Sequence, residues 1–331
     1  MRSSPCKRCP PRSTLNAPFT HIAVVGAGAV GSYFGALLAQ AGHRVTLIGR
    51  GPHVQAIRQG GLHLHRAGTV LTLHPEAHTA LAAAQTADLV LVCVKSADTE
   101  ALATELATVL PAGALVLSLQ NGVQNVATLQ RHLHQTVVPV VVYAATAMPA
   151  PGVVQHFGGG ELVIGPAGRA AAHDEAHMQR LHAVVDLFAS AGVPVRMTDD
   201  PMAALWAKLV VNCACNAVSA LAQANYGQMA ALPAVRELQR AAVHEAVAVA
   251  QADGQAVSLE ASLAAVERIA ATMPAQHSST AQDLARGRAS EVEHLNGCIV
   301  RRGAELGVAT PVNQALYALV KLAEAVAAGR A

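Results

Sequence analysis

The sequence of 331 residues contains few aromatic and few charged side chains. Phenylalanine, tryptophan and tyrosine together make up 3% of the chain, which argues against a surface that stacks nucleic-acid bases. Charged residues amount to 13% and the formal net charge is only +2, so the protein presents no strong field to a polyanion. We therefore expect no nucleic-acid partner.

The sequence offers no clear membrane-spanning segment. A spanning helix needs about 20 apolar residues, and the most apolar stretch, 137–154, is broken by Pro139, Pro149 and Pro151. A buried strand followed by a loop fits this stretch better. Residues 1–19 are basic but contain no apolar segment of the kind found in secretory signals. We expect no membrane association.

Cysteine is also scarce, with six residues scattered along a long chain, which fits reduced thiols in the cytoplasm. Cys6 and Cys9 form a C-x-x-C pair, but they lie in a proline-rich segment with no second pair. We interpret residues 1–19 as a disordered extension. The histidines are dispersed, and His63 and His65 alternate on an expected strand without ligand geometry, so we expect no metal site.

Short apolar runs alternate with helical segments in the first half of the chain. Strands are expected at 21–25, 45–48, 89–94, 115–119 and 137–142, and such Val/Leu/Ile runs between helices are typical of a buried parallel sheet. An antiparallel edge hairpin (153–156 with 162–164), a helix (172–189) and a strand (193–197) are expected to follow.

The pattern changes near residue 198. Thr198 or Asp199 would cap a helix that has Pro201 at an early position, and helical periodicity continues to the end. A chain of this length also favours two domains. We predict an α/β Rossmann-type domain over residues 20–198 and an all-α substrate and catalytic domain over 199–331.

A glycine-rich loop follows the first expected strand and has the pattern G-x-G-x-x-G. In dinucleotide-binding folds the first glycine permits a tight turn, the second lets a pyrophosphate approach, and the third lets the helix pack on the strand. The helix N-terminus then favours the anion. We predict that this loop binds a dinucleotide, and a structural glycine turn is the alternative. Its residues are Gly26, Ala27, Gly28, Ala29, Val30 and Gly31.

The end of the second expected strand indicates which dinucleotide binds. NAD enzymes usually place Asp or Glu there to hold the ribose 2′-hydroxyl, whereas this chain continues Leu47-Ile48-Gly49-Arg50. The planar guanidinium of arginine pairs well with phosphate. We therefore predict NADP(H), with Arg50 at the 2′-phosphate, and a solvated loop arginine is the alternative.

Lys208, Asn212 and Asn216 are spaced four residues apart in an otherwise apolar helical segment. They form one polar stripe, because a step of four residues rotates by only about 40° around a helix. A buried lysine is costly unless it has partners or a task, and desolvation would lower its pKa toward the range useful for proton transfer. A catalytic Lys208 is one interpretation, and a lysine that reaches solvent beside two asparagines is the other.

Together these patterns resemble the ketopantoate reductases (2-dehydropantoate 2-reductases). The resemblance extends over nearly the whole chain and is specific for this superfamily, although less so for one substrate. It is carried by Gly26-x-Gly28-x-x-Gly31, Val94-Lys95-Ser96, Gln120-Asn121-Gly122, Lys208-Leu209-x-x-Asn212-x-x-x-Asn216, Ser278-Ser279, Gln282-Asp283 and Glu291-x-x-x-Leu295-Asn296-Gly297.

The resemblance implies roles for the matching residues. Lys208 would polarise the 2-oxo group and donate a proton to its oxygen while hydride arrives from the nicotinamide, with Glu291 as the second residue of the catalytic centre. Lys95, Asn121 and Glu291 would bind the cofactor. The substrate would be held by Asn121, Lys208, Asn212, Asn216, Asn225 and Ser279, of which Asn225 matches the family only with a small gap.

Structural alternatives stand beside these roles. Ser279 and Gln282 fit a capping box, and Asn121 precedes a glycine in a common turn sequence. Glu291 fits a solvated helix face, and Asp283 fits an i, i+3 ion pair with Arg286.

Two departures from the family concern the substrate. Gln276 replaces a frequent asparagine, and residues 148–152 replace a more polar stretch.

The expected activity is therefore NADPH-dependent reduction of 2-dehydropantoate to (R)-pantoate, a step toward pantothenate and coenzyme A, by a cytoplasmic enzyme. The alternatives are the same chemistry on another 2-oxo acid, or a protein that senses NADP without turnover. An apolar helical domain also favours a homodimer, although the sequence locates no interface.

Overall fold

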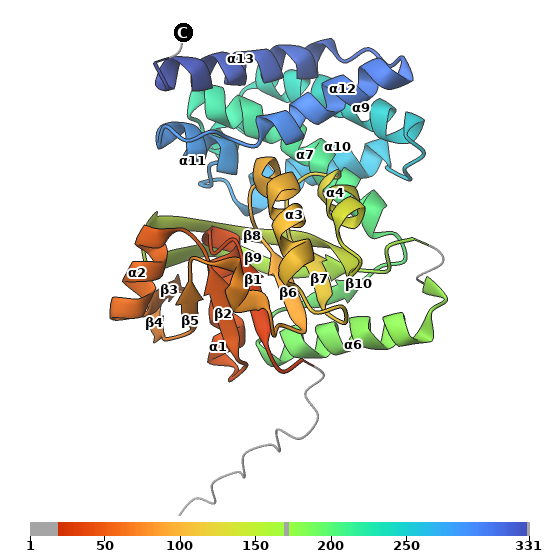
Figure 1. Ribbon diagram of the computed structural model, residues 1–331. Helices are drawn as coiled ribbons and strands as arrows, with labels where there is room; N and C mark the ends of the chain where they lie inside the picture. Colours follow the sequence, from red (N-terminus) through yellow and green to blue (C-terminus); the bar gives the residue numbers. More distant parts are fainter. Residues whose placement is uncertain (1–18, 169–171, 330–331) are drawn as a thin grey trace, which may run out of the picture.

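The computed structural model describes residues 19–168 and 172–329. Within these ranges every β-strand lies before residue 198, and only helices follow (Figure 1). This arrangement confirms the predicted fold class, a mainly parallel α/β sheet followed by helices. Phe19, which we counted with the N-terminal extension, is buried in the core. Cys6 and Cys9 lie outside the described residues.

Parallel strands form the centre of the sheet, in the order β5, β2, β1, β6, β7 and β8. The four middle strands are buried along their whole length, because their Val, Leu and Ile side chains face helices on both sides. Their bounds are β1 (Ile22–Val25), β2 (Val45–Ile48), β6 (Leu89–Val92) and β7 (Leu115–Ser118), with β5 (Glu76–His78) beside β2.

Two apolar layers cover the parallel strands. One layer contains Phe34 of α1 (Ala29–Gln40) and Phe188 of α6 (Glu175–Ser190), whose rings meet edge to face. The other contains Leu106 of α3 (Thr99–Val109) and Leu129 of α4 (Asn125–His132). The remaining elements of this half are α2 (Gly51–Gly60) and two short 3₁₀ helices, η1 (Leu81–Ala84) and η2 (Ser96–Asp98).

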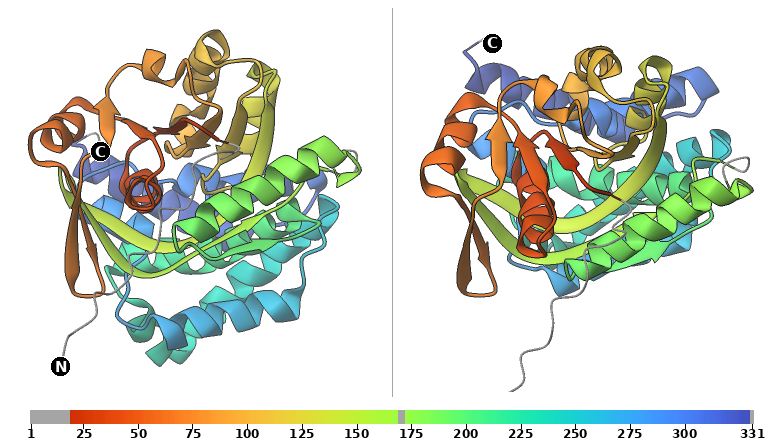
Figure 2. Two further views of the ribbon diagram at one scale, coloured as in Figure 1. Left: turned by 90° about the horizontal axis from the view of Figure 1, so that it is seen from below. Right: turned by 60° about the horizontal axis from the view of Figure 1, so that its bottom comes forward.

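Two long strands extend the sheet toward the helical half. β8 (Thr136–Ala150) pairs antiparallel with β9 (Val153–Ile164), and Figure 2 shows both as long curved ribbons. β9 also pairs with β3 (Leu62–Arg66) and β10 (Val195–Met197), and β3 pairs with β4 (Thr69–Leu73).

Two predictions about this region were wrong. Residues 153–164 form one continuous strand rather than an edge hairpin, because register shifts along β8 absorb the glycines near Gly159. The stretch after residue 142, which we expected to be a loop, continues as β8 through Pro149, where the pairing with β9 is irregular.

The helical half is built around α7 (Pro201–Ala222), which packs on β8 and β9 and on its neighbouring helices. The side chain of Asp200 caps α7 by accepting the N–H of Ala203 at 2.8 Å, so the predicted cap at Thr198 or Asp199 was wrong. The other elements are α8 (Tyr226–Ala231), α9 (Pro233–Ala252), α10 (Leu259–Thr272), α11 (Ser279–Ala285), η3 (Val292–His294), α12 (Asn296–Leu306) and α13 (Pro311–Ala327).

By length and composition, α7 is the one helix in the described ranges that is apolar enough to cross a membrane. However, 72% of its most apolar window is buried inside the protein. The core helix of a folded domain meets the same criteria, so this property of α7 is weak evidence for a membrane span.

Candidate active site

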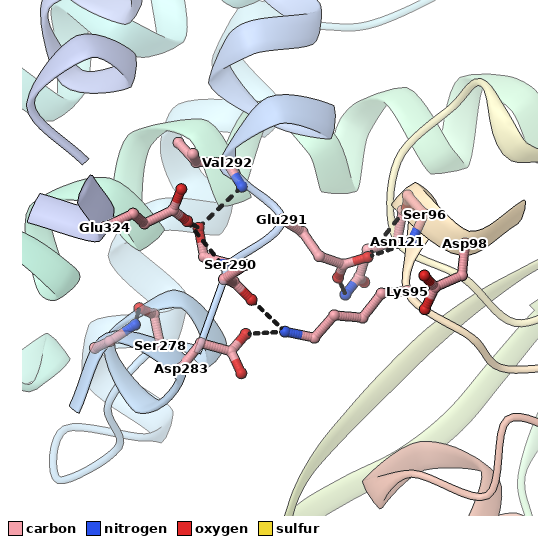
Figure 3. A network of polar contacts seen from close by, with 12 residues as sticks. Lys95, Ser96, Asp98, Asn121, Ser278, Asp283, Ser290, Glu291, Val292 and Glu324 are labelled. Atoms are coloured by element: carbon pink, nitrogen blue, oxygen red, sulfur yellow. Dashed lines mark hydrogen bonds and ion pairs between the residues drawn. The ribbon is translucent and has the colours of Figure 1, made fainter. Parts of the chain in front are cut away.

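Three loops and one helix bring the predicted catalytic residues together. Lys95 follows β6 and Asn121 follows β7, so both lie at the carboxyl edge of the parallel strands, where folds of this type bind ligands. Lys208 comes from α7 and Glu291 from the segment before η3. Figure 3 shows Glu291 in contact with Asn121 and Ser96, and Lys95 in contact with Asp283. The site therefore lies where the sheet edge meets the helical half.

The amine of Lys208 turns toward the sheet. Its Nζ donates to the carbonyl oxygen of Val142 at 2.7 Å and to Oδ1 of Asn121 at 2.8 Å, and it lies 5.9 Å from the centre of the Tyr143 ring. Desolvation lowers the pKa of Lys208 to about 8, and the charge of Glu291 opposes that shift. Because the amine bonds an interior carbonyl, the alternative of a lysine that extends into solvent does not describe it.

Glu291 connects the sheet side to Lys208 through Asn121. Its Oε1 accepts the backbone N–H of Ser96 at 3.0 Å and lies 3.1 Å from the Ser96 hydroxyl. Its Oε2 accepts Nδ2 of Asn121 at 3.0 Å, which directs Oδ1 of that amide to Lys208. Glu291 therefore positions Asn121 beside Lys208 and does not belong to a solvated face.

The three glycines of the glycine loop differ in how closely other atoms pack against them. Gly26 has φ +95°, and an added Cβ would lie 2.5 Å from the backbone nitrogen of Val94. A Cβ on Gly31 would lie 2.4 Å from the carbonyl oxygen of Gly26, whereas one on Gly28 would meet no atom within 4 Å. Gly28 precedes the first turn of α1, which begins with Ala29 and Val30. The loop thus packs tightly at its first and third glycines and is open at the second.

Arg50 lies at the same edge, directly after β2 and before α2. Its side chain is 89% exposed, and its Nη2 is 4.0 Å from Oδ2 of Asp98. Because both side chains are exposed, the Arg50–Asp98 pair contributes little stability. The guanidinium of Arg50 is accessible to a phosphate.

Lys95 reaches across to the helical half. Its Nζ donates to Oδ2 of Asp283 at 2.9 Å and to the carbonyl oxygen of Ala289 at 2.6 Å. The expected partnership of Asp283 with Arg286 was therefore wrong, because the carboxylate turns toward the sheet instead.

The two asparagines of the polar stripe differ in burial. Asn216 is only 4% exposed, and its backbone carbonyl accepts the hydroxyl of Ser278 at 3.1 Å. Asn212 is partly buried one turn closer to Lys208. Neither side-chain amide has a hydrogen-bond partner among the residues that the structure describes, so both are available to a ligand.

The remaining predicted substrate residues lie at helix starts. Asn225 caps α8, where its side chain accepts the N–H of Gln228 and the Gln228 side chain accepts the N–H of Asn225. Ser279 is the exposed first residue of α11, and the cap is the buried Ser278, whose hydroxyl accepts the N–H of Ala281. The capping box expected for Ser279 and Gln282 was therefore wrong, because Ser278 caps the helix and the Ser279 hydroxyl does not.

Several residues of the site were missed by sequence reasoning. Ser96 and Asp283 belong to the motifs quoted for the resemblance, but we assigned no site role to either. Val142 contributes a backbone carbonyl, which leaves no trace in a side-chain pattern. Within the described ranges, no group of three or more His, Cys, Asp or Glu side chains is placed to hold a metal ion.

Comparison with known proteins identifies the family. The model described as ketopantoate reductase PanE/ApbA matches residues 22–169, and the model of the C-terminal part of that family matches residues 200–324. The chain belongs to the ketopantoate reductase family.

Relatives extend over nearly the full length. The 2-dehydropantoate 2-reductase of Halobacterium salinarum is 37% identical over 306 residues, which cover 92% of this chain and 98% of that protein. The enzyme of the same name from Archaeoglobus fulgidus is 35% identical, with coverage of 91% and 96%.

Solved structures agree in fold. The PanE/ApbA family ketopantoate reductase from Ralstonia eutropha JMP134 is 47% identical with a TM-score of 0.85, covering 93% of this chain and 99% of that one. A D-mandelate dehydrogenase in complex with NADH is 25% identical with a TM-score of 0.83, covering 92% and 99%.

Proposed function

We propose that this protein reduces 2-dehydropantoate to (R)-pantoate with NADPH, a step of pantothenate and coenzyme A synthesis. The observation that carries the proposal is the desolvated amine of Lys208, held between the Val142 carbonyl and Asn121 at the edge that carries the glycine loop. A sensor of NADP needs no such proton donor. Relatives that are 2-dehydropantoate 2-reductases by name support the same activity.

The glycine loop fits a nicotinamide dinucleotide. The open space above Gly28 and the N-terminus of α1 would receive the pyrophosphate, and Arg50 would face the 2′-phosphate. Lys95, Asn121 and Glu291 would hold the part of the cofactor nearest the substrate. When bound, NADPH would supply the hydride for the 2-oxo carbon.

Lys208 performs the acid step in this proposal. Its ammonium group polarises the 2-oxo group and then donates a proton to the oxygen as that oxygen becomes an alkoxide. Asn121 keeps the amine in place, and Glu291 keeps Asn121 in place. The free amides of Asn212 and Asn216, with Asn225 and Ser279, would bind the hydroxyl and carboxylate of the substrate.

A second candidate is the same reaction on another 2-oxo acid. The D-mandelate dehydrogenase with a similar structure is named for a different hydroxy acid, and Gln276, two residues before the helix cap Ser278, departs from the family. Residues 148–152 also depart from it, but Gly152 packs against His53 and Ala56 of α2, beyond the end of β8. In this proposal Gln276 affects which acid is bound and leaves the acid step at Lys208 unchanged.

One assay decides among these candidates. Loss of NADPH absorbance is followed with 2-dehydropantoate and with a panel of branched, aromatic and hydroxylated 2-oxo acids. We expect the highest kcat/KM with 2-dehydropantoate. A higher value with another acid would select the second candidate, and NADPH binding without oxidation by any acid would support the sensor.

We also propose a cytoplasmic, homodimeric enzyme. In the described part of the chain Cys93, Cys213, Cys215 and Cys298 are free thiols, which fits a reducing compartment. Sedimentation of the purified protein would test the dimer.

A further inference from the structure

Glu324 lies near the end of α13, and it makes short contacts with Ser290, the residue before Glu291. Its Oε1 accepts both the backbone N–H and the hydroxyl of Ser290 at 2.7 Å (Figure 3). Its Oε2 lies 3.1 Å from the amine of Lys321. The residue is only 9% exposed. A buried carboxylate oxygen that accepts two hydrogen bonds from one loop residue fixes that residue firmly, because hydrogen bonds to a charged group are the stronger kind.

Ser290 directly precedes Glu291, so this contact acts on the backbone that carries Glu291. The Ser290 hydroxyl also accepts the N–H of Val292 at 3.2 Å. Val292 follows Glu291 in the chain, so the backbone is held on both sides of Glu291. From the sheet side, Lys95 holds the carbonyl of Ala289. The segment that presents Glu291 is thus held from α13 on one side and from the end of β6 on the other.

A continuous series of contacts connects α13 to the proton donor. Glu324 holds Ser290, Glu291 follows in the chain and bonds Asn121, and Asn121 bonds Lys208. Burial by itself would raise the pKa of Glu324, but the bonds from Ser290 and the amine of Lys321 keep that pKa below its usual value. The carboxylate is therefore ionised at neutral pH and able to hold both Ser290 donors.

We propose that Glu324 is a positioning residue of the reductase: it fixes Ser290, so that the Glu291 carboxylate stays aligned with Asn121 and Lys208. The proposal rests on the proposed function, because the reaction it assists is the proton transfer from Lys208. Glu324 touches neither substrate nor cofactor in this proposal, and its effect passes through Glu291.

The test is a double-mutant cycle. Glu324→Gln keeps the shape of the side chain but removes its charge, and we expect kcat with 2-dehydropantoate and NADPH to fall roughly tenfold because a charged hydrogen bond is weakened. In a Glu291→Gln background the same substitution should change kcat by less than about twofold, because the effect has no other route. Ser290→Ala should lower kcat in the same way and provides a second variant if Glu324→Gln folds poorly.

The control is Glu305→Gln, which removes an exposed carboxylate of α12 paired with Arg302. It should leave kcat within twofold of wild type. If Glu324 has a purely structural role, the fold-loss of kcat in Glu324→Gln should multiply with the fold-loss in Glu291→Gln, which would overturn the proposal. Wild-type kcat in both Glu324→Gln and Ser290→Ala would also overturn it.

A second readout separates this proposal from the proposed function. The side-chain amide of Asn121 bonds Glu291, so its ¹⁵N–¹H signals should move in Glu324→Gln in the direction that Glu291→Gln moves them. If wild type reduces no 2-oxo acid, the function is wrong, and this spectrum still decides the positioning. Unchanged Asn121 signals in Glu324→Gln would rule out the positioning role even in an active enzyme.

Discussion

The amine of Lys95 and the carboxylate of Asp283 lie 2.9 Å apart and join the end of β6 to α11. Burial raises the pKa of Asp283, and the neighbouring Lys95 opposes that rise. The lysine that we expect to meet the cofactor is thus partly neutralised before any cofactor arrives. The pair connects the two halves of the protein, and we expect Asp283 to compete with the cofactor for Lys95.

Asp283→Asn should release the charge of Lys95 for the cofactor. The Lys95 side chain is 41% exposed, so solvent screens the pair and we expect only about a twofold to fivefold fall in the NADPH Kd. Fluorescence titration with NADPH measures this change, and Asp199→Asn, an exposed carboxylate at the start of the helical half, is the control. Weaker binding in Asp283→Asn would mean that the carboxylate orients Lys95 for the cofactor rather than competing for it.

Lys208→Ala should remove the proton donor and lower kcat by about 10²–10⁴. The substitution leaves the glycine loop untouched, so the NADPH Kd should stay within a fewfold of wild type. Stopped-flow NADPH oxidation and fluorescence titration on the same sample provide the two measurements. A mutant as fast as wild type would remove Lys208 from the mechanism.

The pH dependence of the reaction should report the lowered pKa of Lys208. Only the ammonium form donates a proton, and the pKa is about 8, so kcat should decline as the pH rises through that value, by about tenfold per unit well above it. Glu291 raises this pKa, so Glu291→Gln should move the alkaline limb to lower pH. A limb that stays in place, or moves to higher pH, would contradict the assigned interaction.

Local patterns were sufficient for the centre of the sheet. β1, β2 and β7 agree with the expected strands to within a residue and β6 to within two, because each is a run of Val, Leu and Ile between turn residues. β9 was misjudged because three consecutive glycines usually indicate a turn. Here the long partner strand β8 pairs with Gly158 and Gly159, and register shifts accommodate the positive φ angles of Gly159 and Gly160. No local pattern reveals that partner.

The candidate site was accessible from the sequence only in part. Lys208, Asn121 and Glu291 lie in recognisable motifs, and the structure brings these residues into one network. Glu324 had no such signal, because its role depends on the packing of α13 beneath Ser290. Long-range contacts of this kind arise from the tertiary structure and leave no periodicity in the chain.

Arg50→Ala should alter the choice of cofactor. If the guanidinium pairs with the 2′-phosphate, its loss should raise the KM for NADPH roughly 10- to 100-fold, as expected for a hydrogen-bonded charge, and leave the KM for NADH nearly unchanged. Steady-state rates with each cofactor measure the ratio. Arg44→Ala is the matched control, because that arginine is also exposed and pairs with Glu76 on the neighbouring strand. Equal losses with NADPH and NADH would show that Arg50 does not read the 2′-phosphate.

The glycine loop permits a paired test in which stability and binding separate. In Gly26→Ala the added Cβ would lie 2.5 Å from the Val94 nitrogen on a backbone with φ +95°, so unfolding should become easier by more than about 1 kcal/mol and the Tm should fall. In Gly28→Ala no atom lies within 4 Å of the added Cβ, so the Tm should stay close to that of wild type.

The same methyl group on residue 28 would stand where the pyrophosphate approaches, and NADPH binding should weaken by about an order of magnitude. Differential scanning calorimetry measures the Tm of both variants, and fluorescence titration measures their NADPH Kd. Normal NADPH affinity in a folded Gly28→Ala variant would show that the cofactor does not cross the loop at its second glycine.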